Sequence, residues 1–296
     1  MNGWLTAEQV EHIQWAVQRN RPVGEFVKDL RHATLPALME YGCLRASMGP
    51  TAIPTLPAAI IESPLGQSLD EIPSRIGLHD SQNHNEKPSR VDIRTSEFFS
   101  ISTQDELDSE SPDLTPTPWQ LYAIRFSRSA QAAGFNATVA NGLVAALYEM
   151  AHNAVEHAES PCPALVGFQA ENGVALFCVG DLGRGLLASL RTCSDYAHLT
   201  KHDEAIATAL QEGVTRYGRK RDGSPQSGVG FRQVFRALTD FNGHLRFRSG
   251  DYCLEMLGSD FGPNLGEFRG LPLLPGFQVT VCCRTRANSS GDHPDV

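Results

Sequence analysis

The amino-acid sequence predicts an α/β (α+β) protein, a two-layer sandwich in which helices cover one face of a mixed β-sheet. Three observations support this fold class. Strand-like segments occur in hairpins rather than in strict strand–helix–strand units, amphipathic helices lie between them, and 41% of the 296 residues are hydrophobic. A small, mostly helical N-terminal segment precedes this domain.

The N-terminal part of the chain divides into a helical segment and a linker. In residues 1–46, apolar residues recur at helical spacing on both sides of a Pro22/Gly24 break. Residues 47–116 are first rich in proline and then acidic, which predicts a partly ordered linker, because such stretches bury too little surface to offset chain entropy. One strand is expected within residues 91–101.

The compact domain is predicted over residues 117–286, followed by a disordered tail at 287–296. Its first helix carries apolar residues from Trp119 to Ala130, and its second begins at a plausible N-cap, Asn136. Asn172-Gly173 separates two apolar runs and is typical of a tight type I′ turn, so it predicts a β-hairpin. Further helices are expected at 203–215 and 231–241, and further strands at 244–249, 252–257 and 277–283. The strand at 244–249 alternates as a half-buried strand does.

Charge and cysteine content limit the classes of protein that fit. The formal net charge of −9 argues against a general nucleic-acid binder, which needs a basic face. No apolar run approaches the roughly 20 residues of a membrane-spanning helix, so no membrane partner is expected. The seven cysteines include no C-x-x-C pair, which indicates reduced thiols in a cytoplasmic protein rather than a zinc or redox site.

A first polar feature lies on the helix that begins near Asn136. Glu149, Asn153 and His157 are spaced by four residues, which places them on one stripe of the helix. An amide oxygen can bind Mg²⁺, and a carboxylate one turn away can orient or deprotonate a hydroxyl or water. Taken alone, the pattern also fits a solvated helix face.

Two glycine-rich features follow along the chain. Asp181, with Gly183 and Gly185 beyond it, comes directly after a strand and can accept a hydrogen bond from a purine amino group. Gly228 and Gly230 open a predicted helix, whose N–H groups and dipole favour phosphate. Taken alone, these features also fit an ordinary turn and a flexible basic loop.

In this order, the three features resemble the GHKL superfamily of ATP-binding domains. Glu149-Met-Ala-His-Asn153-Ala-Val-Glu-His157 is similar to the N box of that family, in the form typical of anti-sigma-factor serine kinases. Asp181-Leu-Gly183-Arg-Gly185 matches the D-x-G-x-G box, and Gly228-Val-Gly230 matches the later glycine box. The resemblance covers about residues 117–286, the extent of one domain.

The resemblance implies a Bergerat-type ATP-binding fold with ATP and Mg²⁺ as cofactors. By this carry-over Asn153 ligates Mg²⁺, Glu149 is the general base or positions the attacking nucleophile, and Asp181 binds the adenine amino group. A mobile lid is implied at about 191–227, and residues 258–276 replace a short turn with no assigned role. The remaining site residues are Gly183 and Gly185 shaping the pocket, Gly228 and Gly230 contacting phosphates, and, by charge alone, Arg216 and Lys220 as phosphate contacts.

The expected function is that of a cytosolic ATPase or serine/threonine protein kinase that regulates a partner protein. The alternative is an ATP-sensing binding module with little or no turnover. A histidine kinase is a further alternative, with His32 as phosphoacceptor on a dimerising helix hairpin. The N-terminal helices have three open roles, namely docking on the ATP-binding domain, forming a homodimer and binding another protein.

Two other classes are set aside. Gly183-x-Gly185-x-x-Ala188 fits the looser dinucleotide-binding fingerprint, but that motif must lie in a βαβ unit and here follows a hairpin. His152 and His157 are five residues apart, whereas zinc hydrolases place two histidines four apart on a helix.

Overall fold

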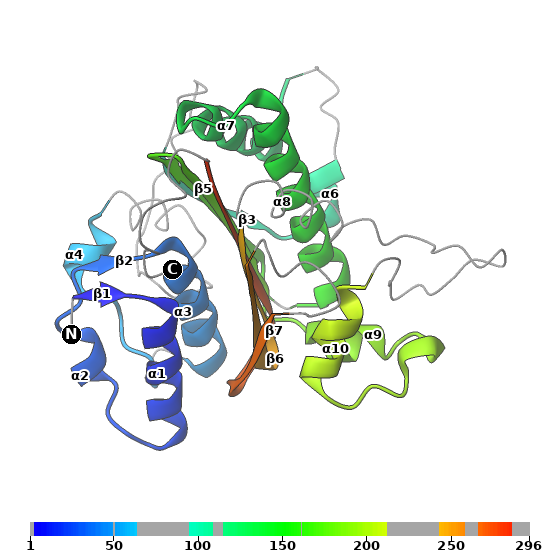
Figure 1. Ribbon diagram of the computed structural model, residues 1–296. Coiled ribbons are helices and arrows are strands. Elements are labelled where there is room, and N and C mark those ends of the chain that lie inside the picture. The colour runs from blue at the N-terminus through cyan, green and yellow to red at the C-terminus, as the bar shows by residue number, and fades with distance from the viewer. Residues whose placement is uncertain are drawn as a thin grey trace.

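The computed structural model describes residues 3–49, 51–63, 95–108, 115–160, 162–211, 243–257 and 266–285. Within these ranges, one five-stranded sheet has helices packed against both of its faces (Figure 1). No helix in the described ranges is both long and apolar enough to cross a membrane.

The central sheet contains five strands in the order β3-β4-β5-β7-β6. The strand expected within 91–101 is the edge strand β3, and β4 and β5 form the hairpin predicted from Asn172-Gly173. Both turn residues have positive φ, +51° at Asn172 and +77° at Gly173, as a type I′ turn requires. The bounds are β3 Ser96–Ile101, β4 Ala164–Glu171, β5 Val174–Gly180, β6 His244–Leu257 and β7 Glu267–Arg284.

The strand directions correct the expectation of a mixed sheet. All four neighbouring pairs in the five-stranded sheet run antiparallel. Strands β5 and β6 point in the same direction, but β7 lies between them. The five-stranded sheet therefore contains no parallel pair of neighbours, and the parallel pair among the described strands is the separate two-stranded sheet β1-β2.

The segments predicted as separate strands at 244–249 and 252–257 form one strand, β6. Its pairing with β7 shifts register around Gly250, whose φ of +64° suits glycine. The last strand also begins earlier than predicted, because residues 267–276 already pair with β6. Residues 267–276 of the expected insertion therefore form the first part of β7, which pairs with β6 in a long hairpin.

One face of the sheet is covered by α7 (Pro118–Ala132) and α8 (Ala137–Ala158). Thr117 and Gln120 form a capping box at the start of α7. Asn136 is the N-cap of α8, as predicted, and its side chain accepts a hydrogen bond from the Val139 N–H at 3.0 Å. The apolar faces of both helices share one core with alternate residues of the strands, among them Val166, Phe168, Phe177, Val179, Val279 and Val281.

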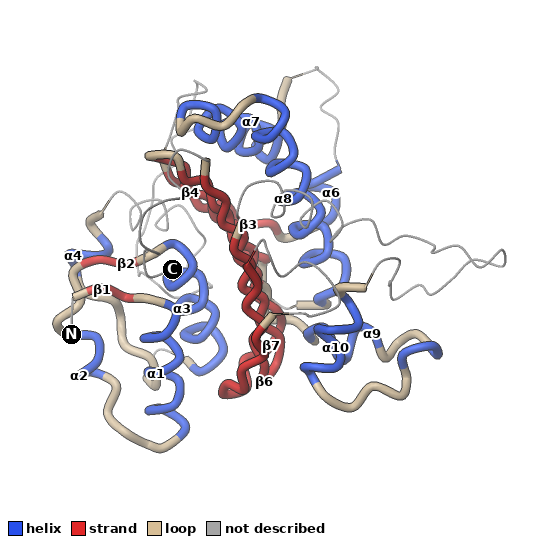
Figure 2. Tube along the Cα trace, viewed as in Figure 1, coloured by secondary structure: helices blue, strands red, loops and turns tan. Residues whose placement is uncertain are grey.

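The other face of the sheet is covered by the N-terminal segment, which corrects the expectation of helices on one face only. Figure 2 shows α1 and α3 on the opposite side of the strands from α7 and α8. Their apolar residues pack with Leu165, Cys178 and Leu274 of the sheet. The elements of this layer are β1 Trp4–Leu5, α1 Ala7–Gln18, α2 Gly24–Val27, β2 His32–Ala33, α3 Leu35–Met48 and α4 Ala58–Ile61.

Short helices lie near the ends of β3 and β5. Helix α6 (Gln104–Asp108) follows β3, and α9 (Gly185–Leu190) follows β5. A 3₁₀ turn at Ser194–Tyr196 and α10 (His202–Ala209) come next, and a small apolar cluster that includes Leu190 and Ala205 holds them to α9. The helix predicted at 231–241 and the tail at 287–296 lie outside the described residues.

Candidate functional site

Asp181 follows β5 directly and is the most unusual polar residue near the sheet. Its side chain is only 1% exposed, and Oδ1 accepts a hydrogen bond from the Gly183 N–H at 2.6 Å. Among the described residues Oδ2 has no hydrogen-bond partner. Burial raises the pKa of Asp181 to about 7, although contacts with the backbone of Gly183 and of Phe277 oppose the rise. A buried carboxyl group with one unused oxygen is suited to bind a ligand that donates a hydrogen bond.

Three glycines allow the backbone to pack closely around this carboxyl group. A Cβ on Gly183 would lie 2.0 Å from the Ala158 carbonyl oxygen, at the end of α8. Gly276, at φ +77°, has no room for a side chain because a Cβ would lie 2.1 Å from the Asp181 carbonyl oxygen. Gly185, at φ +72°, faces Gly276. Gly183 and Gly276 therefore let the backbone on either side of Asp181 approach closely, and Gly185 packs against Gly276.

The loop that carries Asp181 is joined to the end of α8. The Arg184 N–H donates to the Ala158 carbonyl at 2.8 Å, and the Arg184 side chain pairs with Glu159. At about 1.5 Å of rise per residue, Asn153 lies about 7.5 Å before Ala158 along the helix axis and Glu149 about 13.5 Å before it. The structure thus brings the C-terminal end of α8, the helix that carries Glu149 and Asn153, to the Asp181 loop.

Glu149 and Asn153 are both half-buried on α8. No hydrogen bond or ion pair joins either side-chain head group to another described side chain. The described residues also contain no group of three or more His, Cys, Asp or Glu side chains that could hold a metal. Mg²⁺ bound to phosphates needs only one or two protein ligands, so a single Asn153 is compatible with it.

The sequence did not predict a polar cluster that Asp108, Tyr148 and His152 form beside Glu149. Asp108 of α6 accepts hydrogen bonds from the Tyr148 hydroxyl at 2.7 Å and from His152 Nε2 at 3.1 Å. The Tyr148 hydroxyl bond is the main cause that lowers the pKa of Asp108 to about 2. Asp108 lies in the acidic run assigned to the linker, and the only available signal was the i, i+4 spacing of Tyr148 and His152.

The phosphate-binding part of the expected site lies outside the described residues. This concerns Gly228 and Gly230 as well as Arg216 and Lys220. Of the expected lid at 191–227, the described part ends at residue 211 and contains the 3₁₀ turn and α10, which packs against β6.

His32 does not lie on a helix. It belongs to the two-residue strand β2, is exposed, and stacks on Trp4 with ring centroids 4.7 Å apart. Helix α3 begins only after the N-cap Thr34. A histidine kinase needs its phosphoacceptor on a dimerising helix, so the arrangement around His32 argues against that alternative.

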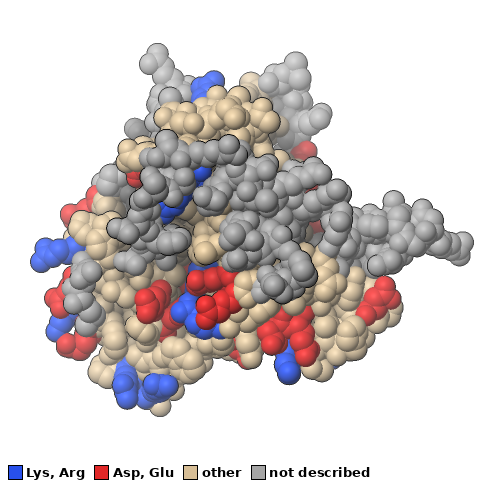
Figure 3. All heavy atoms as spheres, viewed as in Figure 1, with Lys and Arg blue, Asp and Glu red and all other residues tan. Residues whose placement is uncertain are grey.

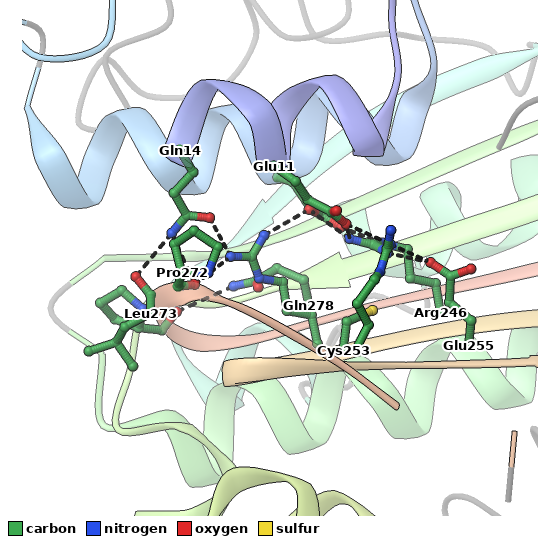
Figure 4. Close-up of polar contacts among 12 residues, drawn as sticks. Glu11, Gln14, Arg246, Cys253, Glu255, Pro272, Leu273 and Gln278 are labelled. Atoms are coloured by element: carbon green, nitrogen blue, oxygen red, sulfur yellow. Dashed lines mark hydrogen bonds and ion pairs between the residues drawn. The ribbon is translucent and has the colours of Figure 1, made fainter. Parts of the chain in front are cut away.

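A second polar centre lies between the sheet and the N-terminal helices (Figure 4). Arg246 of β6 pairs with Glu40 at 2.8 Å and with Glu11 at 2.7 Å. Arg248 pairs with Glu40 at 3.2 Å and donates to the Gln14 side chain. Burial alone would raise the pKa of Glu40, but the two guanidinium groups hold it below its usual value.

The buried arginines correct the expectation of a half-buried strand at 244–249. Arg246 is 2% and Arg248 0% exposed, because carboxylates from α1 and α3 are brought to them across more than 200 residues of sequence. The alternation of residues along the strand correctly assigned the arginines and the apolar residues to opposite faces of the sheet. It could not show that the N-terminal helices cover the face that carries the arginines. On the side of the molecule that Figure 3 shows, the basic and acidic side chains of the described residues lie interspersed on the surface.

Comparison with protein-family models gives no match, and comparison with curated protein sequences gives none either.

Proposed function

We propose that this protein binds Mg·ATP in a GHKL-type site with a Bergerat-type fold. We further propose that it is a cytoplasmic ATPase or serine/threonine protein kinase that acts on a regulatory partner protein. The seven cysteines are all free thiols, which supports the cytoplasmic location.

The observation that carries the proposal is the buried Asp181 carboxyl group with its unused Oδ2. An adenine amino group is a hydrogen-bond donor of the kind this oxygen lacks. The position of Asp181 supports the same reading, because its loop is bonded to the end of the helix that carries Glu149 and Asn153. A purely structural aspartate would be expected to use both of its oxygens within the protein.

Each residue has a distinct role in this proposal. Asp181 binds and selects the base, and Asn153 offers its amide oxygen to the Mg²⁺ ion. Glu149, one turn earlier on α8, accepts the proton of the attacking hydroxyl or water. Mg²⁺, when bound, neutralises charge on the phosphates, so the protein's contribution is largely positioning.

Calorimetric titration with Mg·ATP tests the binding site. The wild type should bind, and Asp181→Ala should weaken binding by about 10- to 100-fold, the value of a hydrogen bond to a charged group. Asn153→Ala should weaken Mg·ATP more than ATP without the metal. Asn141→Ala, an exposed position on the same helix, is the matched control and should bind as the wild type does. Unchanged affinity in both site variants would refute the proposed site.

Phosphate release and phosphotransfer test the catalytic part separately. Glu149→Ala should lose turnover by at least about 100-fold, in the range that general-base catalysis contributes, while its affinity for Mg·ATP stays within about threefold. Glu156→Ala, two turns further along α8, is the control for a lost carboxylate. Binding by the wild type without any turnover would restrict the function to an ATP-sensing module.

A further inference from the structure

Gln278 occupies the point of β7 where the Asp181 loop and the N-terminal layer meet. Its Cα is paired with Gly180 of β5 on one side and with Arg248 of β6 on the other. The side chain is 4% exposed, and its Nε2 donates to the Asp181 carbonyl at 3.2 Å and to the Pro275 carbonyl at 3.3 Å. No sequence pattern singles out this residue, because a lone Gln on a strand is usually a surface residue.

Three hydrogen bonds hold Asp181, and one of them comes from the side chain of Gln278. The Asp181 N–H donates to the Phe277 carbonyl at 3.0 Å, and Oδ1 is fixed by the Gly183 N–H. The Gln278 amide holds the Asp181 carbonyl. With both main-chain groups and one carboxylate oxygen fixed, the direction of the remaining oxygen, Oδ2, is fixed as well.

The support for Gln278 comes from the N-terminal layer. Arg248, its neighbour on β6, is bonded to Glu40 of α3 and to the Pro272 carbonyl at 2.9 Å. The same helix packs against the end of β5, because a Cβ on Gly180 would lie 3.1 Å from the Met39 sulfur. Figure 4 shows Gln278 below α1, next to this set of polar contacts.

We propose that Gln278 is a positioning residue for Asp181, and that it sets the selectivity of the site for a purine that carries an amino group. This inference rests on the proposed function. At pH 8, where Asp181 is ionised, a carboxylate in a fixed direction accepts from the adenine amino group and repels the carbonyl oxygen that inosine has at the same place. If the Gln278 amide is removed, the loop can turn, and the difference between the two bases becomes smaller.

The test compares Mg·ATP with Mg·ITP (inosine triphosphate) by calorimetry in the wild type, Gln278→Met and Thr280→Val. The wild type should prefer ATP by at least about tenfold. Gln278→Met, which keeps the volume but removes the donor, should reduce this ratio at least about fivefold. Thr280→Val changes a buried polar residue two positions further on β7 and should keep the wild-type ratio.

Thermal unfolding of each variant separates loss of selectivity from loss of folding. If Gln278→Met does not fold, Gln278→Asn takes its place, since its amide is one methylene too short to reach Asp181. A folded variant that keeps the wild-type ratio would overturn the positioning role while leaving the ATP site intact. A wild type that does not bind Mg·ATP would instead refute the proposed function, and a wild type that binds both nucleotides equally would refute the role of Asp181 in base selection.

Discussion

At the scale of the residue, Asp181 illustrates how a binding group can cost stability. Its ordinary pKa of 3.8 rises to about 7 because burial disfavours the charged form. Between these two values the folded protein holds a proton that the unfolded chain has lost. The stability of the ligand-free protein should therefore fall as the pH rises from about 4 to about 7, and stay low above that range. A residue retained under such a penalty is expected to have a function.

The substitution Asp181→Asn removes the ionisation and should therefore stabilise the ligand-free protein at high pH. The free energy of unfolding of the variant minus that of the wild type should be about 1 to 4 kcal/mol larger at pH 8 than at pH 5, since each pKa unit corresponds to about 1.4 kcal/mol. Urea unfolding at pH 5, 6.5 and 8 measures this gain. Asp195→Asn, at an exposed position, should change stability by less than about 0.5 kcal/mol at every pH.

At the scale of the element, the edge strand β3 is tied to α7 by a buried ion pair. Arg125 Nε lies 2.6 Å and Nη2 2.5 Å from the two carboxylate oxygens of Glu97, a bidentate arrangement. Both side chains are buried, at 5% and 3% exposure. The pair joins a strand from the region predicted as linker to the first helix of the compact domain.

Removing one partner of this pair should be worse than removing both. Arg125→Met leaves a buried carboxylate without its partner and should lower the free energy of unfolding by about 3 to 5 kcal/mol. The double variant with Glu97→Gln should recover a large part of that loss, because the stranded charge is gone. Denaturant unfolding of the two single variants and the double variant gives the coupling. Equal losses in Arg125→Met and in the double variant would show that the charge is not what matters.

At the scale of the whole molecule, the sheet lies between two helical layers that are far apart in sequence. The N-terminal layer shares an apolar cluster with β4, β5 and β7 and is bonded to β6 through Arg246 and Arg248. Of the roles left open for the N-terminal helices, docking on the sheet is the one that the structure shows. The layer therefore belongs to the same folding unit as the sheet.

This arrangement predicts a single cooperative unfolding transition. Trp15 of α1 reports on the N-terminal layer, and Trp119 of α7 reports on the opposite layer. In variants that keep only one of these tryptophans, with the others changed to Phe, fluorescence and circular dichroism should give coincident denaturant midpoints within each variant. An earlier transition at Trp15 would show that the N-terminal layer unfolds as a separate domain.

The carboxylate that joins the two layers offers a second check at this scale. Glu40→Gln removes the carboxylate that Arg246 and Arg248 share, leaving Arg246 with Glu11 and Arg248 with no ion pair to a described residue, and should lower the free energy of unfolding by about 3 kcal/mol or more. Glu25→Gln removes a carboxylate from an exposed pair with Lys28 and should cost less than about 1 kcal/mol. Unfolding of the two variants in guanidinium chloride measures both effects. Similar losses in the two would show that Glu40 contributes no more to stability than a carboxylate in an exposed ion pair.

The local features of this protein can be predicted from short stretches of its sequence. Asn136 as N-cap, the Asn172-Gly173 hairpin and the stripe of Glu149 and Asn153 depend on residues within a few positions of one another, so composition and spacing reveal them. Three further features become visible only in the folded chain, namely the position of β7 between β5 and β6, the burial of Arg246 and Arg248, and the contact of Gln278 with Asp181. Each of these depends on groups that are tens to hundreds of residues apart, and spacing along the chain carries no record of which distant side chain will supply the matching charge or donor.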